Sequence, residues 1–356
     1  IVLGRDRKLV VRDHVVILGG GRVGIACLMA LEQLSNKDRR TAVREVVFID
    51  RTRPLLPPNM GIRCTTLVGD VSDARLLQRA RVDTARFLIA ATGDDLENLR
   101  AAGTAFELAS RQNRHRALPT LVRVGSHHLS RHVTSSQKQG EVAIQRTSGN
   151  AADGATKAGP PDHYAYRTAF NVYEIAARHV FAASMHSDQS PAGATEHIVI
   201  CGFGRFGQAV AREAMRCQET GCGPKIAQID VVDLDAERLV HEFAFGPESL
   251  ALDGWIRPHD ASILSPEVWG VISGEHGGMH SRVFVCTDAD EANLTYAAAI
   301  ASKAALGEEA GCETTIFVRQ PHQATWRLPV DSRVQLVPVV GDDVIGALQQ
   351  ILSEFT

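Results

Sequence analysis

Two stretches of the 356-residue chain share one pattern: HVVILGGGRVG at His14–Gly24 and HIVICGFGRFG at His197–Gly207. In each, a short apolar run leads into a loop of the form GxGxxG. The loops begin 183 residues apart, and the same spacing separates Asp50, which ends VVFID, from Asp233, which ends QIDVVD. An apolar strand, a GxGxxG loop and an acid ending the next strand are typical of a dinucleotide-binding βαβ unit. The sequence therefore predicts two copies of one such unit.

A third landmark repeats in the same order. FLIAATGDDLENL at Phe87–Leu99 parallels VFVCTDADEANL at Val283–Leu294, here with an offset of 195 residues. The second copy thus has an insertion of about a dozen residues before this point, which we assign to the Gly-rich segment Gly274–His280. Each copy is far longer than a solenoid repeat, so we expect tandem globular domains.

Short β-branched runs alternate with helical patterns, which predicts an α/β fold of two tandem Rossmann-like, doubly wound parallel-sheet domains. We expect a first domain over residues 1–150, a linker and crossover helix over 151–196, and a second domain over 197–356. The helix is predicted from about His163 to Met185, with Tyr166 and Phe170 on its apolar face. It could cross between domains, pack on a partner chain or cover an edge of the first copy. The predicted strands are Val15–Leu18, Glu45–Ile49, Arg63–Val68, Phe87–Ala90, Thr120–Val124 and Glu141–Gln145, then Ile198–Cys201, Ala227–Val232, Trp255–Arg257, Arg282–Cys286, Thr314–Arg319 and Gln335–Val339.

The glycine loops have a specific chemistry. The first glycine permits a tight turn, the second lets backbone N–H groups approach a pyrophosphate, and the third lets the helix pack close to the strand. The helix N-terminus adds unpaired N–H donors and partial positive charge, and the arginine of each loop could add a charge-assisted contact. Alternatively, a loop is a structural remnant that binds nothing. The predicted phosphate-binding residues are Gly19, Gly20, Gly21, Arg22, Val23 and Gly24 in the first copy and Gly202, Phe203, Gly204, Arg205, Phe206 and Gly207 in the second.

Acidic residues follow the next two strands of each copy. Asp50 and Asp233 stand where a carboxylate accepts hydrogen bonds from ribose hydroxyls, which favours NAD(H) or another adenine nucleotide over NADP. Arg51 and Arg53, just after Asp50, soften that preference in the first copy. Asp70 and Asp260 follow the third strands, and either meet the adenine side or cap the short helices that follow. Thr92 and Thr287, at the ends of the fourth strands, are further candidates for the same clefts.

Composition excludes several function classes. Lys and Arg number 38 against 41 Asp and Glu, a net charge of −3 that argues against a nucleic-acid binder. No stretch approaches 18 uninterrupted apolar residues, so we expect no membrane span. Seven scattered cysteines fit a reduced, cytosolic setting. We find no catalytic motif and no metal-ligand spacing: His276 and His280 lie in a glycine-rich segment, and Cys217 and Cys222 lack a second pair.

The ordered set GGGRVG, FID, VGDVSDARLLQRARV and IAATGDDLENL resembles the RCK domain, the regulator of potassium conductance, also called the Trk/Ktr N-terminal nucleotide-binding domain. GFGRFG in the second copy is also typical of it, and the resemblance covers residues 12–135 and 195–325. It implies binding of NAD(H), ATP or ADP, sometimes of divalent cations, and assembly by face-to-face pairs into a gating ring. Carried over, the ribose acids are Asp50 and Asp233 and the adenine-side acids Asp70 and Asp260. The second copy departs from the pattern at His259 and Asp288.

The resemblance implies a cytoplasmic gating module, peripheral to the inner face of the membrane, for a potassium channel or transporter. The pore is either upstream in the same chain or a separate subunit, and the module self-associates as a dimer or a tetrameric ring. Two other hypotheses stay open at this point: an NAD-dependent oxidoreductase with an unrecognised catalytic site, and an assembly module whose sites are degenerate.

Overall fold

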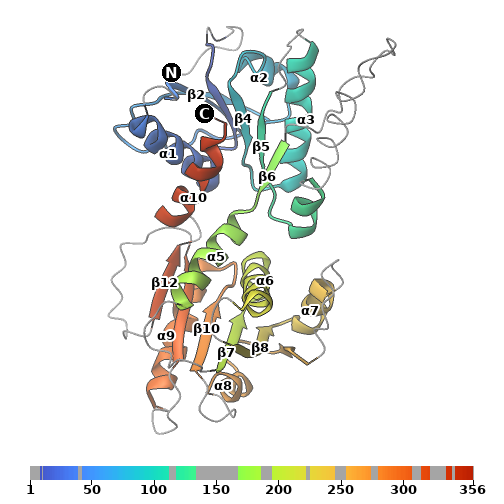
Figure 1. Ribbon diagram of the computed structural model, residues 1–356, viewed down its shortest axis with the longest axis vertical. Helices are drawn as coiled ribbons and strands as arrows, with labels where there is room; N and C mark the ends of the chain where they lie inside the picture. Colours follow the sequence, from blue (N-terminus) through green and yellow to red (C-terminus); the bar gives the residue numbers. More distant parts are fainter. Residues whose placement is uncertain are drawn as a thin grey trace. The chain divides into compact units, whose positions relative to one another are not determined.

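The computed structural model describes residues 9, 11–38, 42–111, 118–133, 167–185, 195–221, 225–244, 254–273, 280–306, 314–320, 334–338 and 341–355. The chain divides into two compact units (Figure 1). The first unit contains Ile1–Val172 and Ile345–Thr356, and the second contains Tyr173–Val344. The limits predicted from the repeat, 1–150, 151–196 and 197–356, stay a prediction about the repeating unit.

The first unit is built on a six-stranded sheet of order β3-β2-β1-β4-β5-β6, in which every pair is parallel. This is the strand order of a dinucleotide-binding doubly wound fold. The central strands are apolar along their whole length because helices cover both faces. The strands are β1 (Val15–Leu18), β2 (Glu45–Asp50), β3 (Arg63–Val68), β4 (Phe87–Ala90), β5 (Thr120–Arg123) and β6 (Arg167–Phe170).

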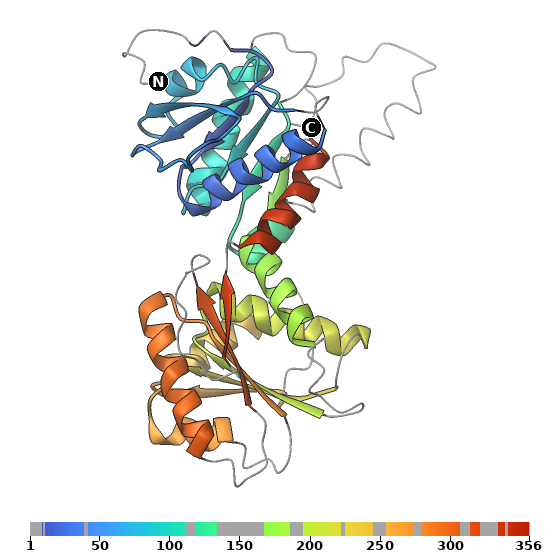
Figure 2. The same ribbon diagram turned by 90° about the vertical axis from the view of Figure 1, so that its left-hand side faces the viewer.

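Two layers of helices cover this sheet. On one face, α2 (Ala74–Arg79) and α3 (Asp95–Arg111) bury Leu77, Ala102 and their neighbours against alternate strand residues such as Val16. On the other face lie α1 (Arg22–Lys37) and α10 (Asp342–Ser353), which run side by side (Figures 1 and 2). The Phe355 ring, just beyond α10, lies 5.9 Å from that of Phe87 in β4.

The second unit repeats the topology, with a six-stranded parallel sheet of order β9-β8-β7-β10-β11-β12. Both copies therefore have the predicted fold class. The strands are β7 (Thr195–Cys201), β8 (Lys225–Asp233), β9 (Ile256–Asp260), β10 (His280–Val285), β11 (Thr314–Gln320) and β12 (Val334–Pro338).

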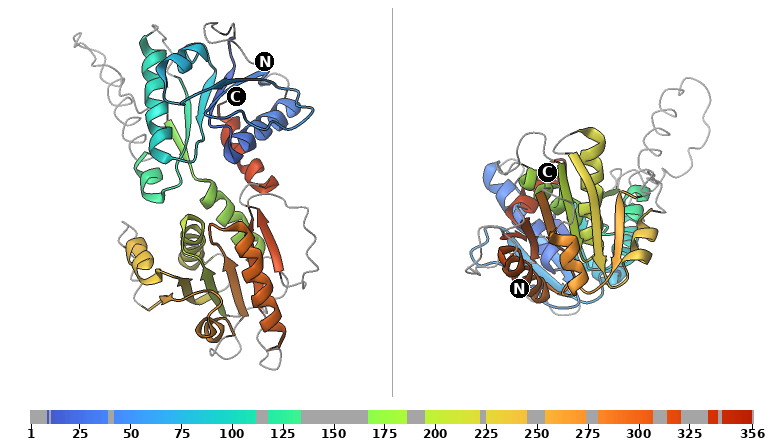
Figure 3. Two further views of the ribbon diagram at one scale, coloured as in Figure 1. Left: turned by 180° about the vertical axis from the view of Figure 1, so that it is seen from behind. Right: turned by 90° about the horizontal axis from the view of Figure 1, so that it is seen from below.

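Helices again cover both faces of the second sheet (Figure 3). The cluster on one face joins Val199 and Val285 to residues of α8 (Pro266–Ser273) and α9 (Asp290–Leu306). On the other face, Phe181 of α5 (Val172–Met185) stacks 6.3 Å from Phe284 of β10. Helices α6 (Arg205–Thr220) and α7 (Ala236–Ala244) complete the unit.

The helix after the sixth strand is exchanged in both copies. Helix α5 follows β6 of the first sheet, yet from Tyr173 onward it belongs to the second unit. Helix α10 follows β12 of the second sheet, yet from Ile345 onward it belongs to the first unit. The core of each unit therefore includes a helix whose preceding strand lies in the other.

The structure corrects one prediction and leaves two others outside its description. A continuous helix from His163 is wrong, because Arg167–Phe170 forms β6, paired with β5, and the helix begins only at Val172. The apolar spacing of Phe170 fits a strand as well as a helix, so periodicity over four residues could not separate them. The strand predicted at Glu141–Gln145 and the insertion at Gly274–His280, except its last residue, lie outside the described residues.

Three of the cysteines are buried in the cores of the two units. Cys27, Cys201 and Cys286 are each at most 1% exposed, and burial raises the pKa of the first two thiols to about 12. No helix in the described part of the chain is both long and apolar enough to cross a bilayer.

Candidate functional site

The order of each sheet creates a crevice at one place. Strand β1 lies between β2 and β4, and β7 lies between β8 and β10. The chain leaves β1 toward α1 on one face and leaves β4 toward α3 on the other, so the carboxyl ends of β1 and β4 border a switch point. Both predicted glycine loops lie at these ends, directly after β1 and β7.

The first and third glycines of each loop are required by space and backbone conformation. Gly19 has φ +96°, and a Cβ there would lie 2.8 Å from the Thr92 nitrogen. A Cβ on Gly24 would lie 2.0 Å from the Gly19 carbonyl oxygen. Gly202 and Gly207 repeat this geometry, with φ +95° and an approach of 2.2 Å. The tight turn and the close helix–strand contact are therefore present in both copies.

The second glycine of each loop faces the crevice. Gly21 and Gly204 are the N-cap residues of α1 and α6, and the backbone of each is extended. Among the described residues, neither helix has a hydrogen bond from an N-cap side chain to its first turn. A Cβ on Gly21 would meet nothing within 4 Å. The N-terminus of α1 thus directs its first N–H groups toward open space, the arrangement that binds a phosphate. At α6 a Cβ on Gly204 would lie 3.7 Å from Asp288 Oδ2, so a carboxylate stands beside that helix N-terminus.

The other loop residues divide between the crevice and the core. Arg22 and Arg205 are exposed at the first position of their helices, beside the second glycine. Val23, Phe203 and Phe206 are buried, and the Phe203 ring lies 5.3 Å from that of Phe243 in α7. Only the backbone of these three positions can therefore take part in ligand binding.

The acid at the end of the second strand is bonded to the loop in the same way in both copies. The Gly20 backbone N–H donates to Asp50 Oδ2 at 2.5 Å, and the Phe203 N–H donates to Asp233 Oδ2 at 2.8 Å. The Thr52 N–H donates to the other Asp50 oxygen at 2.8 Å. Each carboxylate is half-buried and has lone pairs left for ribose hydroxyls.

The rim of the first crevice is charged. Asp70 accepts hydrogen bonds from the Ser72 hydroxyl at 2.7 Å and the Ser72 backbone N–H at 2.8 Å. These bonds lower the pKa of the Asp70 carboxyl, and Arg51, 3.6 Å away, lowers it further. Arg51 also donates to Glu97 Oε1 at 2.7 Å. Asp73, not Asp70, is the N-cap of α2, so the capping alternative for Asp70 does not hold.

The rim of the second crevice differs. Asp260 accepts a hydrogen bond from the Glu237 backbone N–H at 2.9 Å. It therefore bonds to the first turn of α7 and not to the short helix that follows it. Leu234 stands at the position of Arg51, immediately after the ribose acid, and is 80% exposed.

Sequence reasoning missed the residues that hold Thr92 and Thr287. The buried Asn98 amide accepts from the Thr92 N–H and hydroxyl, each at 2.8 Å, and donates to the Thr92 and Arg123 carbonyls. Arg123 also donates to the Thr92 carbonyl at 2.5 Å. The repeat could have revealed the pair, because Asn98 recurs as Asn293 and Arg123 as Arg319.

The second copy has the same network. Asn293 accepts from the Thr287 N–H and hydroxyl, and Arg319 donates to the Thr287 carbonyl at 2.9 Å. Arg319 additionally pairs with Asp288 at 2.6 Å, and Asp288 is one of the positions where this copy departs from the first. Each crevice therefore has one wall fixed by a buried Asn–Arg pair.

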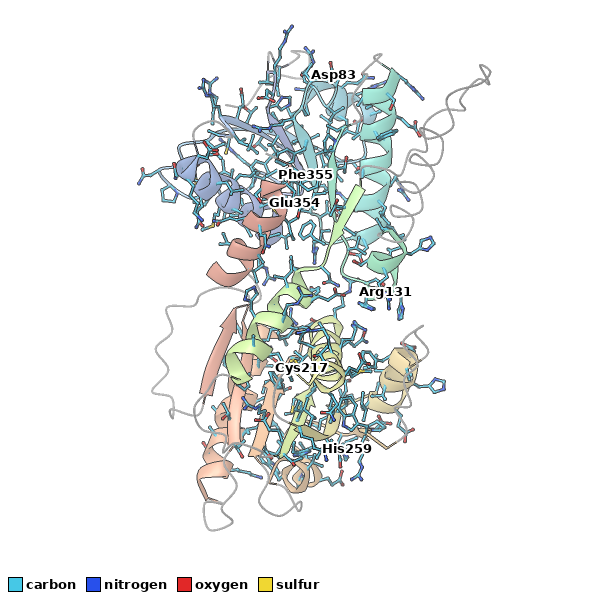
Figure 4. All side chains as sticks on the ribbon, in the orientation of Figure 1. Asp83, Arg131, Cys217, His259, Glu354 and Phe355 are labelled. Carbon is cyan, nitrogen blue, oxygen red and sulfur yellow. The ribbon has the colours of Figure 1, made fainter. Side chains whose placement is uncertain are left out.

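A second feature beyond the sequence predictions lies in the second unit. Buried Asp230 accepts from His197 at 2.5 Å and from His259 at 2.7 Å, while His197 Nδ1 lies 3.3 Å from the Ser281 hydroxyl. Burial alone would raise the pKa of the Asp230 carboxyl, but the hydrogen bonds from His197, His259 and Gln228 hold it below its ordinary value. His259 is part-exposed (Figure 4) and precedes Asp260, so the cluster reaches the rim.

Six large apolar side chains among the described residues are exposed. They lie on a strand end, in loops or in a first helical turn: Leu55, Leu56, Val68, Leu96, Leu234 and Leu264.

Comparison with known proteins agrees with this geometry. The family model of the TrkA-N domain matches residues 15–127. Among solved structures, the GsuK channel superposes with a TM-score of 0.52 at 14% identity, over 99% of this chain and 65% of that one. The present chain thus spans about two thirds of the channel's length, and this likeness supports the fold.

Other comparisons add nothing on function. A dipicolinate synthase from Bacillus halodurans has a TM-score of 0.31 at 13% identity, over 96% of this chain and 97% of that one. A phosphoglycerate oxidoreductase from Rhizobium etli has a TM-score of 0.32 at 13% identity, over 96% and 93%. No curated protein matches the sequence. The family match covers the first glycine loop and strands β1 to β5: residues 15–127 of this chain match the TrkA-N domain.

Proposed function

We propose that the chain is a regulatory module that binds NAD(H), or ATP or ADP, in its two crevices and thereby controls potassium transport through a membrane channel or transporter. One observation carries the proposal. In both copies a helix N-terminus without a side-chain cap, a glycine at its N-cap position and a carboxylate bonded to the loop stand together at the switch point. These groups complement the phosphates and the ribose of an adenine nucleotide.

The role in potassium transport has separate support. Residues 15–127 match the family model of the TrkA-N domain, and a structure with a similar fold over 99% of this chain is the GsuK channel. In this proposal the module lies in the cytoplasm, at the inner face of the membrane, and self-associates as a dimer or tetrameric ring. The pore belongs to the same polypeptide or to a separate subunit. Nucleotide binding changes the gate only through its different affinity for the two states of the module.

Isothermal titration calorimetry with NAD⁺, NADH, ATP and ADP tests the binding step. Gly21→Asp and Gly204→Asp each place a carboxylate where phosphate would bind, and each is expected to remove one site. Gly346→Asp in α10 and Gly270→Asp in α8 are controls, because they add the same charge to the same units at positions where a Cβ meets nothing within 4 Å.

Two results would contradict the proposal. Absence of binding below about millimolar concentration for all four nucleotides would remove the sensing role. Unchanged binding in both Gly21→Asp and Gly204→Asp would contradict the placement of the sites. Turnover of NAD⁺ to NADH with a substrate, lost on mutating one polar crevice residue, would favour an oxidoreductase instead.

A further inference from the structure

The two crevices share their loops but not their rims, and the difference centres on Arg51. Its guanidinium lies 2.7 Å from Glu97 Oε1 and 3.6 Å from Asp70 Oδ2. Arg51 follows the end of β2, Glu97 is in the first turn of α3, and Asp70 follows β3. In the order β3-β2-β1-β4, the bridge from Arg51 to Glu97 therefore passes the carboxyl end of β1, where the glycine loop lies.

The place that Arg51 occupies suits a planar hydrogen-bond donor. Asp50, immediately before it, marks where the ribose of a nucleotide would lie. Asp70 and Glu97 offer carboxylate oxygens on two sides, and the exposed side chains of Val68 and Leu96 stand close to these acids in the sequence. An adenine ring has two apolar faces and an exocyclic amino donor, so it matches the same surroundings as the guanidinium.

The second crevice cannot form this bridge with the matching residues. The position of Arg51 is held by Leu234 and that of Glu97 by Ala292, neither of which can form an ion pair. Asp260, which matches Asp70, bonds to the Glu237 backbone N–H instead. The second crevice therefore lacks the bridge that Arg51 forms across the first.

We propose that Arg51 is a built-in competitor of adenine in the first crevice, held in the base position by Glu97 and Asp70 and displaced when an adenine nucleotide binds. This inference rests on the proposed function and adds to it that the two crevices are unequal. The first must break an ion pair before it accepts the base. The second accepts the base without that cost, so it fills at lower nucleotide concentration.

The proposal is tested by giving the first crevice the residues of the second. In a Gly204→Asp background, which confines binding to the first crevice, calorimetry measures the affinity for adenosine and for ADP. Arg51→Leu and Glu97→Ala each remove the bridge, and each is expected to tighten binding about two- to fivefold, the range measured for ion pairs of this exposure. The double variant is expected to match the single ones, because both remove the same interaction.

Arg53→Leu is the matched control. It removes the same charge two residues further on, from an exposed position, and is expected to leave the affinity for adenosine unchanged. Adenosine separates the base from phosphate electrostatics, because it has no charge, whereas ADP would also respond to the loss of a nearby cation.

The outcomes separate this inference from the proposed function. Weaker adenosine binding by Arg51→Leu would mean that Arg51 contacts the ligand. Unchanged adenosine binding would mean that the Arg51–Glu97 bridge does not compete with adenine. Either result overturns the inference and leaves the proposed function intact. An equal rise in the affinity of Arg53→Leu for adenosine would also overturn the inference, because the loss of a positive charge alone would then explain the tighter binding. Absence of ADP binding in the wild-type chain and every variant would instead overturn the proposed function.

Discussion

The last helix of each copy belongs to the unit of the other copy, so a substitution near the end of the chain is expected to destabilise the first unit. Leu352 belongs to α10, which the chain reaches only after completing the second sheet, yet this part of the helix lies in the first unit. Its side chain is fully buried. Neighbouring contacts hold the helix there, since Lys37 of α1 donates to the Gln349 side chain at 3.2 Å and the Phe355 ring meets Phe87. Leu352→Ala should therefore destabilise the first unit and not the second.

The magnitude follows from burial and position. Leu→Ala at fully buried sites costs about 2–5 kcal/mol. Because α10 is a 12-residue helix near the chain end, it can shift to fill part of the cavity, which places the expected loss near 2–3 kcal/mol. For a unit of this size each kcal/mol lowers Tm by roughly 2–4 °C, so a fall of about 4–12 °C is expected.

The chain provides a selective assay. Of the three tryptophans, Trp255 and Trp269 lie in the described part of the second unit, so in a Trp326→Phe background fluorescence follows the unfolding of that unit. Circular dichroism follows both units, and hydrogen exchange resolves β1 and β4 from β7 and β10. Leu352→Ala should lower the temperature of the transition measured by circular dichroism and speed the hydrogen exchange of β1 and β4. The transition temperature measured by tryptophan fluorescence should not change. Ile300→Ala, buried in α9, should do the reverse. A fluorescence transition that falls in Leu352→Ala would refute the assignment of α10 to the first unit.

Four further substitutions test the site and the buried cluster. Gly24→Ala should cost more than about 2 kcal/mol and abolish nucleotide binding, because its Cβ would meet a backbone oxygen at 2.0 Å, whereas Gly21→Ala should leave Tm within about 1 °C. Asn98→Ala should cost about 2–4 kcal/mol in chemical denaturation, because it leaves the Thr92 N–H without its side-chain acceptor; a loss below about 0.5 kcal/mol would contradict that role. For Asp230, whose pKa is lowered on folding, the stabilisation is present above the unfolded pKa near 3.8 and is lost as the pH falls through the folded pKa. Asp230→Asn should therefore lower Tm at about pH 7 but flatten the loss of stability below about pH 4, measured by tryptophan fluorescence; an unchanged pH profile would contradict it.

The sequence alone was sufficient for the fold class and for the parts of the site that the backbone determines. Apolar runs, glycine spacing and the acids ending β2 and β8 are local signals, and they placed the strands and both loops to within a few residues. The sixth strand escaped prediction because Arg167–Phe170 has only four residues, followed almost at once by a helix. The exchange of α5 and α10 left no local signal, since which sheet a helix covers depends on contacts distant in the sequence.

Side-chain contacts across strands were equally out of reach. His14 and His197 begin almost identical strands, and nothing in their local sequence distinguishes them. In the first copy the His14 ring bonds to the Ala80 carbonyl, and burial lowers its pKa. In the second copy Asp230 stands where the first has Val47, so the equivalent histidine meets a carboxylate. The difference lies on a neighbouring strand, 33 residues away.

The two crevices share some residues and differ in others, and this difference would affect the response of the module to its ligand. Glycine geometry, the carboxylate-to-loop bond and the Asn–Arg wall recur in both copies, and in the proposed function these groups form the two nucleotide sites. The bridge from Arg51 to Glu97 is present in the first copy, and in the proposal made above it lowers the affinity of that site for adenine. If both crevices had the same affinity, occupancy would rise over a single narrow range of concentration. In a chain whose two crevices differ in affinity, nucleotide occupies the crevices in two successive steps. Because a ligand shifts a conformational equilibrium only through its different affinity for the two conformations, each binding step can favour a different conformation of the module. Titrating the wild-type chain with ADP should accordingly require two dissociation constants, and Arg51→Leu should bring them closer together.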